Sequence, residues 1–167
     1  MATTAKVTYG TSTTTVITLA ALTSNTAGIA RECTALDNTS NLYLDAMMFI
    51  ECAITAGTVG LDKCVYIYFY GSENGTHFND VSVTGTDAAL TFNVTGHNLI
   101  GPVVMSFGSS TSGLTSNRIT IPSVASIFSG NIPRKWGFVV YNSSNINLSS
   151  TEALSIHTYT GLYEVAV

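Results

Sequence analysis

The sequence has little charge and no cluster of basic residues. Of its 167 residues, 10% are Asp, Glu, Lys or Arg, whereas an ordinary soluble domain carries about 25%. The six basic residues are scattered along the chain, and only Arg134 and Lys135 are adjacent. Proteins that bind nucleic acids need a basic patch to contact the phosphates. We therefore expect no nucleic acid partner.

Long apolar runs and paired cysteines are also missing. No apolar run approaches the roughly 20 residues that a membrane-spanning helix needs, so no membrane partner is expected. Residues 1–10 lack a basic region followed by an apolar core, which argues against a signal peptide and favours a cytoplasmic origin. An odd number of cysteines in such a protein argues against a disulfide framework, and no CxxC spacing suggests zinc. We interpret Cys33, Cys52 and Cys64 as buried small hydrophobic residues.

Catalytic motifs are absent as well. The three histidines, His77, His97 and His157, are far apart in the sequence, and neither an HExxH motif nor a GxSxG elbow is present. The acidic residues occur singly, without the DxDxDG pattern of a calcium loop, so structural calcium stays only an open alternative. The sequence predicts that the protein is not an enzyme and that it needs no cofactor or metal ion.

The missing charge is replaced by Thr, Ser, Asn and Gly, while hydrophobic residues make up 46% of the chain. A surface of this kind protects poorly against self-association. A protein whose surface is largely covered by neighbouring subunits does not need that protection. The composition therefore favours a subunit of an assembly, and we expect a homo-oligomer whose order the sequence does not specify.

The most apolar short stretch is Cys64–Tyr70, which predicts a central β-strand. Val65, Ile67 and Phe69 would point to one face of an extended chain, and three tyrosines would point to the other face. Because both faces are apolar or aromatic, we expect this strand to be covered on both sides. A buried helical turn is the alternative, but seven residues are too few for a typical helix.

The longest apolar segment, residues 42–55, alternates with a period of two. Every even-numbered position from Leu42 to Ile54 is apolar, which is the pattern of a half-buried strand. We expect this strand and the central strand to form an antiparallel pair joined by a modest loop. Further strands are predicted at residues 76–83, 88–94, 135–142 and 154–165, among others.

Short strands at fairly regular spacing, with hardly any helical pattern, predict an all-β protein. At this length we expect an antiparallel β-sandwich with a jelly-roll-like arrangement. One domain should cover residues 16–167, and the Thr-rich residues 1–15 should form a flexible arm that orders on a partner. The expected core residues are Met48, Ile50, Val65, Ile67, Phe69, Phe138 and Val140.

Three aromatic residues are candidates for surface stacking on a sugar or for an interface: Tyr70, Phe78 and Trp136. Large rings more often contribute to the core, so burial is the competing interpretation. A bound glycan is therefore an alternative that the sequence leaves open.

Four stretches resemble small virion proteins of tailed bacteriophages: ALDNTSNLYLDA (35–46), KCVYIYFYGSENGTHFND (63–80), IPRKWGFVVYN (132–142) and the closing run from residue 149. The resemblance implies a structural protein of the virion, assembled in the host cytoplasm. The role it favours is a capsid decoration or cement protein that binds the major capsid protein and stabilises the head lattice. A tail or neck component and a carbohydrate-binding module on the virion surface are the alternatives.

Overall fold

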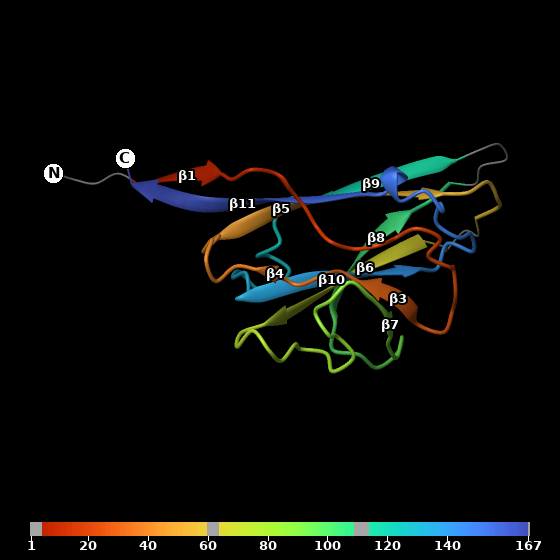
Figure 1. Ribbon diagram of the computed structural model, residues 1–167, viewed down its shortest axis with the longest axis horizontal. Coiled ribbons are helices and arrows are strands. Elements are labelled where there is room, and N and C mark those ends of the chain that lie inside the picture. Colours follow the sequence, from red (N-terminus) through yellow and green to blue (C-terminus); the bar gives the residue numbers. More distant parts are fainter. Residues whose placement is uncertain (1–4, 60–63, 109–113, 167) are drawn as a thin grey trace.

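The computed structural model describes residues 5–59, 64–108 and 114–166, and it consists of two antiparallel β-sheets packed face to face (Figure 1). The first sheet has the strand order β1 (Ala5–Tyr9), β11 (Ile156–Ala166), β5 (Asp45–Ile54) and β9 (Thr115–Ile121), and β2 (Thr13–Thr14) also pairs with β11. The second sheet has the order β7 (Ala88–Thr91), β3 (Ile29–Glu32), β10 (Lys135–Asn142), β6 (Cys64–Ser72) and β8 (Ile100–Ser106), and β4 (Leu36–Asp37) also pairs with β10. A single 3₁₀ turn, η1 (Glu152–Leu154), precedes β11.

The strand order is that of a jelly roll. If β1 and β2 count as one strand, and β4 and β7 are set aside, eight strands remain in two sheets of four. These are β1-β11-β5-β9 and β3-β10-β6-β8. If the eight strands are renumbered one to eight in chain order, the two sheets read 1-8-3-6 and 2-7-4-5, and every neighbouring pair is antiparallel. Two interleaved Greek keys produce this alternation between the sheets. The predicted all-β sandwich is therefore confirmed.

The core lies between the two sheets, where the expected residues are found. All seven expected core residues are buried, with at most 1% of each residue exposed. The even positions of β5 from Ala46 to Ile54 are buried as the alternation predicted, whereas Leu42 and Leu44 precede the strand and are exposed. The three cysteines are buried, as expected. Burial raises the pKa of the Cys33 and Cys52 thiols to about 12.

The expected pairing of the central strand with its predecessor is wrong. β5 belongs to the first sheet and β6 to the second, so the connection between them crosses from one sheet to the other. β6 pairs instead with β10 over eight residue pairs and with β8. Both partners follow β6 in the sequence, and β10 begins more than sixty residues later. A short connection between two apolar strands does not determine whether they share a sheet or face each other across the core.

The central strand is covered on both sides, as expected. One side faces the first sheet, and the other is covered by the segments before and after β7, residues 73–87 and 92–99, which we call the cover (Figure 1). Phe78 contacts Tyr70 with ring centroids 5.1 Å apart, and His97 contacts Tyr68 at 4.9 Å. A strand was expected at residues 76–83, but these residues form turns. Their role is to close the outer face of the second sheet.

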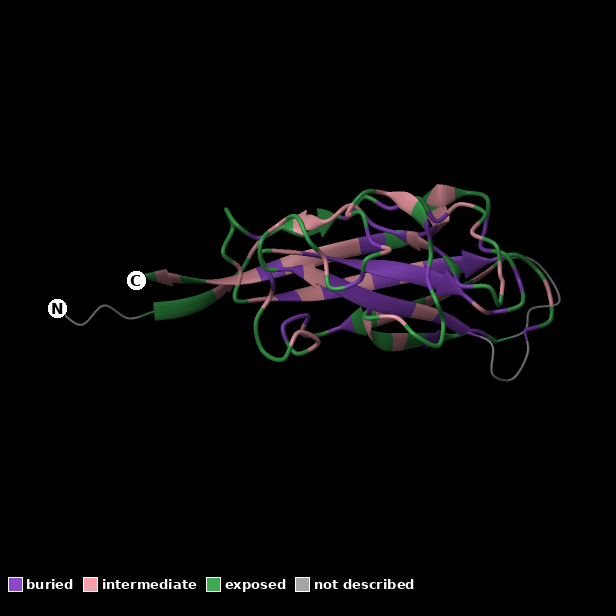
Figure 2. Ribbon diagram, turned by 90° about the horizontal axis from the view of Figure 1, so that it is seen from below, coloured by how far each residue is buried: buried purple, intermediate pink, exposed green. Residues whose placement is uncertain are grey.

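The N-terminal segment differs from the expected flexible arm. Residues 1–4 lie outside the described residues, but β1 pairs with β11 over five residue pairs, and β2 pairs with β11 farther along. The pairing of β11 with β5 ends at Leu162, so only β1 accompanies the last residues of β11. β1 and residues 162–166 of β11 therefore form a two-stranded ribbon that projects from the sandwich (Figures 1 and 2). We call it the terminal ribbon.

Candidate interaction surface

The two sheets differ in what covers their outer faces. The second sheet is closed by the cover, while the outer face of the first sheet carries no such segment in the described part of the chain (Figure 1). We call this outer face the open face. It consists of outward-pointing residues of β5, β9 and β11: Met47, Phe49, Glu51, Ser116, Arg118, Thr120, Ile156, Thr158 and Thr160.

The open face is apolar and threonine-rich with a single ion pair. Strand register places Phe49 between Thr120 and Thr158 in one row across the sheet. The next row places Glu51 between Arg118 and Ile156, and the Arg118 Nη2 to Glu51 Oε1 distance is 3.8 Å. Phe49 is only partly buried, and Ile156 is 45% exposed. A partner could cover such a surface at a small cost of desolvation, because few charges would leave water.

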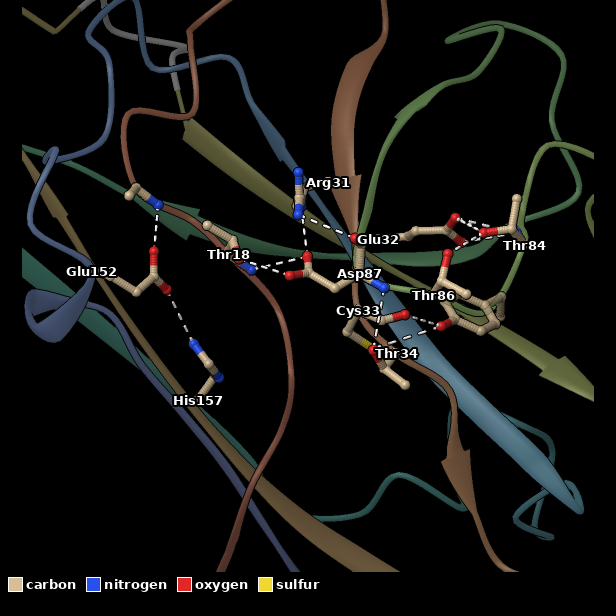
Figure 3. Close-up of polar contacts among 12 residues, drawn as sticks. Thr18, Arg31, Glu32, Cys33, Thr34, Thr84, Thr86, Asp87, Glu152 and His157 are labelled. Carbon is tan, nitrogen blue, oxygen red and sulfur yellow. Dashed lines mark hydrogen bonds and ion pairs between the residues drawn. The ribbon is translucent and has the colours of Figure 1, made fainter.

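The cover is fixed to the second sheet by a buried carboxylate (Figure 3). Glu32 on β3 is 1% exposed and accepts hydrogen bonds from the backbone N–H and the hydroxyl of Thr84, at 3.0 Å and 2.5 Å. The N–H of Gly85 donates to the same carboxylate at 3.3 Å. Buried carboxylates are tolerated when several donors surround them, and here the donors all belong to one turn of the cover.

Asp87 makes a second connection, between the cover, β3 and the segment before it (Figure 3). Its carboxylate accepts from Arg31 Nε at 2.6 Å and from the hydroxyl of Thr18 at 2.7 Å. Burial by itself would raise the pKa of Asp87, but the hydrogen bonds from Arg31 and Thr18 outweigh it and bring the pKa to about 2. The ionised form is therefore the one that the folded protein favours.

Acid is expected to weaken this connection. Because the pKa of Asp87 in the folded protein lies below its ordinary value of 3.8, ionised Asp87 stabilises the fold above that pH. The contribution is lost as the pH falls from 3.8 to about 2. Urea unfolding at several pH values should show a steeper loss of stability in this window for the wild type than for Asp87→Asn. Equal slopes for the two proteins would contradict the assignment.

A hydroxyl, an imidazole and a carboxylate lie in line near the start of β11, in an order that resembles a catalytic triad. The Thr15 hydroxyl lies 3.0 Å from His157 Nδ1, and His157 Nε2 lies 3.5 Å from Glu152 Oε1. The other Glu152 oxygen accepts from the N–H of Ala20 (Figure 3). Thr15 and His157 are 2% and 6% exposed, so a substrate cannot reach the hydroxyl. This group connects the segment before β3 to β11.

The structure corrects the surface role of two of the three candidate aromatic residues. Tyr70 is fully buried, and its hydroxyl donates to the carbonyl of Cys33 at 2.5 Å. Trp136 is 2% exposed and packs edge-on against Tyr159 of the other sheet. Phe78 belongs to the cover and is partly buried against Tyr70. Tyr70 and Trp136 therefore have no free ring face for a sugar, because the two sheets and the cover enclose them.

A different pair of aromatic residues lies at the surface, where sequence reasoning did not place a site. Tyr43 lies over Gly161 and between Tyr159 and Tyr163, with ring centroids 6.4 Å and 6.1 Å away. A Cβ atom at Gly161 would lie 2.4 Å from the Tyr43 ring, so only glycine allows this approach. Tyr43 and Tyr163 line a surface hollow whose other residues are Gly10, Thr11, Thr13, Ser40 and Asn41. None of these lining residues is charged. The polar residues 37–41, which favour a loop, are the sequence feature that could have indicated this hollow.

The described residues contain neither a candidate metal site nor a candidate membrane-spanning helix. Within residues 5–59, 64–108 and 114–166, no group of three or more His, Cys, Asp or Glu side chains could hold a metal ion. In the same part of the chain, no helix is long and apolar enough to cross a membrane.

Comparisons of the chain with protein-family models, with curated proteins and with solved structures found no match. The open face and the terminal ribbon are therefore the features of the molecule that point most directly to a function.

Proposed function

We propose that this protein is an accessory component of a bacteriophage virion, and that it decorates the capsid exterior and bridges major capsid subunits. The observation that carries the proposal is the open face. One sheet of the sandwich is closed by its own cover, and the other presents a partly apolar, nearly uncharged surface. An exposed, partly apolar sheet face of this kind is typical of a protein that binds a neighbouring subunit through it.

Two further observations support the proposal. The overall scarcity of charge suits a protein held in an assembly rather than one dispersed at high concentration. The jelly roll is common among viral capsid domains, although it also occurs in lectins, and a fold does not by itself specify a function. The resemblance of four stretches to small virion proteins favours the viral role over the others.

Cryo-electron microscopy of the phage particle would test the location. We expect the chain on the head lattice in many copies, with the open face against major capsid subunits. A specific contact of this kind should bury about 1,200 Å² or more in total. Finding the chain only at the tail or neck, or absent from virions, would contradict the proposal.

A pair of variants tests the surface itself. Phe49→Lys places a charge in the centre of the open face and should reduce binding to purified heads at least tenfold, because the new charge would have to be desolvated. Val81→Lys is the matched control, since Val81 is fully exposed on the cover, on the opposite side of the sandwich. Equal binding of the two variants would exclude the open face as the capsid contact.

A carbohydrate-binding role is the second candidate, and the Tyr43–Tyr163 hollow is the observation that favours it. Aromatic rings beside neutral hydroxyl and amide groups are suited to stacking on sugars and hydrogen bonding with them. Glycan-array binding that is lost in Tyr43→Ala but retained in Phe49→Lys would support this role.

A further inference from the structure

We propose that the terminal ribbon is the dimerisation element of this protein, and that the free edge of β1 pairs with β1 of a second copy about a two-fold axis at Val7. The result would be one continuous sheet through both molecules. This inference does not depend on the virion role, since it concerns how two copies of the chain associate.

The ribbon lacks support within one molecule. β1 pairs with β11 on one side, and within the described residues no strand pairs with its other side. Val7 is 54% exposed and Tyr9 is 64% exposed. A two-stranded ribbon is only marginally stable in water, and a third strand or a packed face is what normally stabilises it. The ribbon is therefore expected to hold this shape best when another strand lies beside it.

The hydrogen-bonding groups on the free edge can be identified. The N–H of Gly10 donates to the carbonyl of Gly161 at 2.8 Å, so the groups of Gly10 point toward β11. The N–H of Leu44 donates to Leu162 from the other side of β11, which fits the same alternation. Hydrogen-bonding direction alternates along an antiparallel strand. The N–H and C=O groups of Ala5, Val7 and Tyr9 therefore point away from β11, toward the free edge.

These three residues are symmetric about Val7, and this symmetry selects the register. In an antiparallel pair centred on Val7, Val7 faces Val7 of the second copy, and Ala5 faces Tyr9 in both directions. All three outward-pointing positions then find a partner, giving about six backbone hydrogen bonds. A centre between two residues would place outward-pointing groups opposite inward-pointing ones. Within β1, a centre at Lys6 or Thr8 would pair only two of the three outward-pointing positions, and a centre at Ala5 or Tyr9 only one.

The side chains fit the same register. Ala5, Val7 and Tyr9 project from one face, beside Leu162, Glu164 and Ala166 of β11. The largest side chain, Tyr9, would lie beside the smallest, Ala5, and the two Val7 side chains would meet at the axis. Lys6, the only charged residue of β1, would face Thr8, so no like charges would be opposed. Edges that avoid such pairing often contain proline, as β8 does at Pro102, but β1 has none.

These features favour a second copy of the chain as the partner of the free β1 edge. A two-fold contact requires that one surface be complementary to itself, and the size and hydrogen-bonding pattern of this five-residue strand meet that requirement. Strand addition at a free edge is a common mode of association. Dimerisation would also place the open faces of two molecules in one extended surface.

Cysteine cross-linking tests the register directly. Residues that form a hydrogen-bonded antiparallel pair have Cα atoms about 5.5 Å apart, which suits a disulfide. Val7→Cys should therefore form a cross-linked dimer under mild oxidation. Tyr9→Cys is the matched control, because it is on the same face of the same strand, but the two copies would lie about 14 Å apart. The native cysteines are buried and should contribute little background.

We expect at least fivefold more cross-linked dimer for Val7→Cys than for Tyr9→Cys on a non-reducing gel. Light scattering of the full wild-type chain should show a mass that rises toward that of a dimer with concentration, and Val7→Pro should weaken this association at least tenfold. Val7→Pro removes an outward N–H and leaves the bonds to β11 in place, and circular dichroism would verify its fold. A monomeric wild type at all concentrations, or equal cross-linking of the two cysteine variants, would overturn the proposal.

Discussion

Replacing Trp136 by alanine is expected to lower the free energy of unfolding by about 3–5 kcal/mol, which is the usual cost of removing a large aromatic ring from a core. Trp136 lies on the inner face of β10, opposite Gly71 of β6, and is 2% exposed. Its ring packs against Tyr159 of the first sheet with centroids 5.8 Å apart, so it joins the two sheets.

Urea unfolding monitored by circular dichroism would measure this loss. Val81→Ala is the control, because Val81 is fully exposed on the cover and should change stability by less than about 0.5 kcal/mol. A loss below about 1 kcal/mol for Trp136→Ala would mean that the ring contributes little to packing between the sheets. The same result would return Trp136 to the candidates for stacking on a sugar or for an interface.

Replacing Glu32 by alanine should cost about 3 kcal/mol, since it removes a buried acceptor that several donors share. The N–H groups of Thr84 and Gly85 and the hydroxyl of Thr84 would lose their partner. The turn that carries them also holds Asp87, so both connections between the cover and β3 should weaken together. Glu32→Gln keeps one acceptor oxygen and should lose roughly half as much.

Hydrogen exchange separates a local from a global effect. In Glu32→Ala the amides of Thr84 and Gly85 should exchange faster, while amides of β5 in the other sheet should keep most of their protection. Glu73→Ala is a suitable control, because Glu73 is an exposed carboxylate of the same cover. Unchanged protection at residues 84 and 85 would show that Glu32 does not hold the turn.

The pattern of residues along each strand was readable from the sequence. The alternation in residues 46–54 and the two apolar faces of residues 64–70 predicted most of the buried side chains correctly, although Ala53 is buried on the other face of β5 and Tyr66 is only partly buried. The scarcity of helical pattern correctly predicted an all-β sandwich. These features are local, because a strand's two faces repeat every two residues and each face shows its environment in its composition.

The candidate site was predictable only in part. The sequence indicated a surface poor in charge, but it did not show which sheet face would stay open. Tyr70, Trp136 and Tyr43 are all large aromatic residues in apolar surroundings, yet the first two are buried and Tyr43 lines a surface hollow. Tyr70 is buried because the cover packs over it. The turns of the cover show no hydrophobic periodicity in the sequence, because individual polar contacts such as those of Glu32 hold them in place.

The sequence by itself determined most of the strands, their inward faces and the neutral character of the surface, but not the turns at residues 76–83. The tertiary structure decided that β5 and β6 belong to different sheets, that residues 73–87 and 92–99 close one outer face, and that β1 leaves the body of the sandwich beside β11. The physical reason is that burial of a side chain depends on its own strand, whereas strand pairing depends on segments far apart in the chain. An apolar strand satisfies its local pattern equally well against several partners, and only the packing of the whole chain selects one of them.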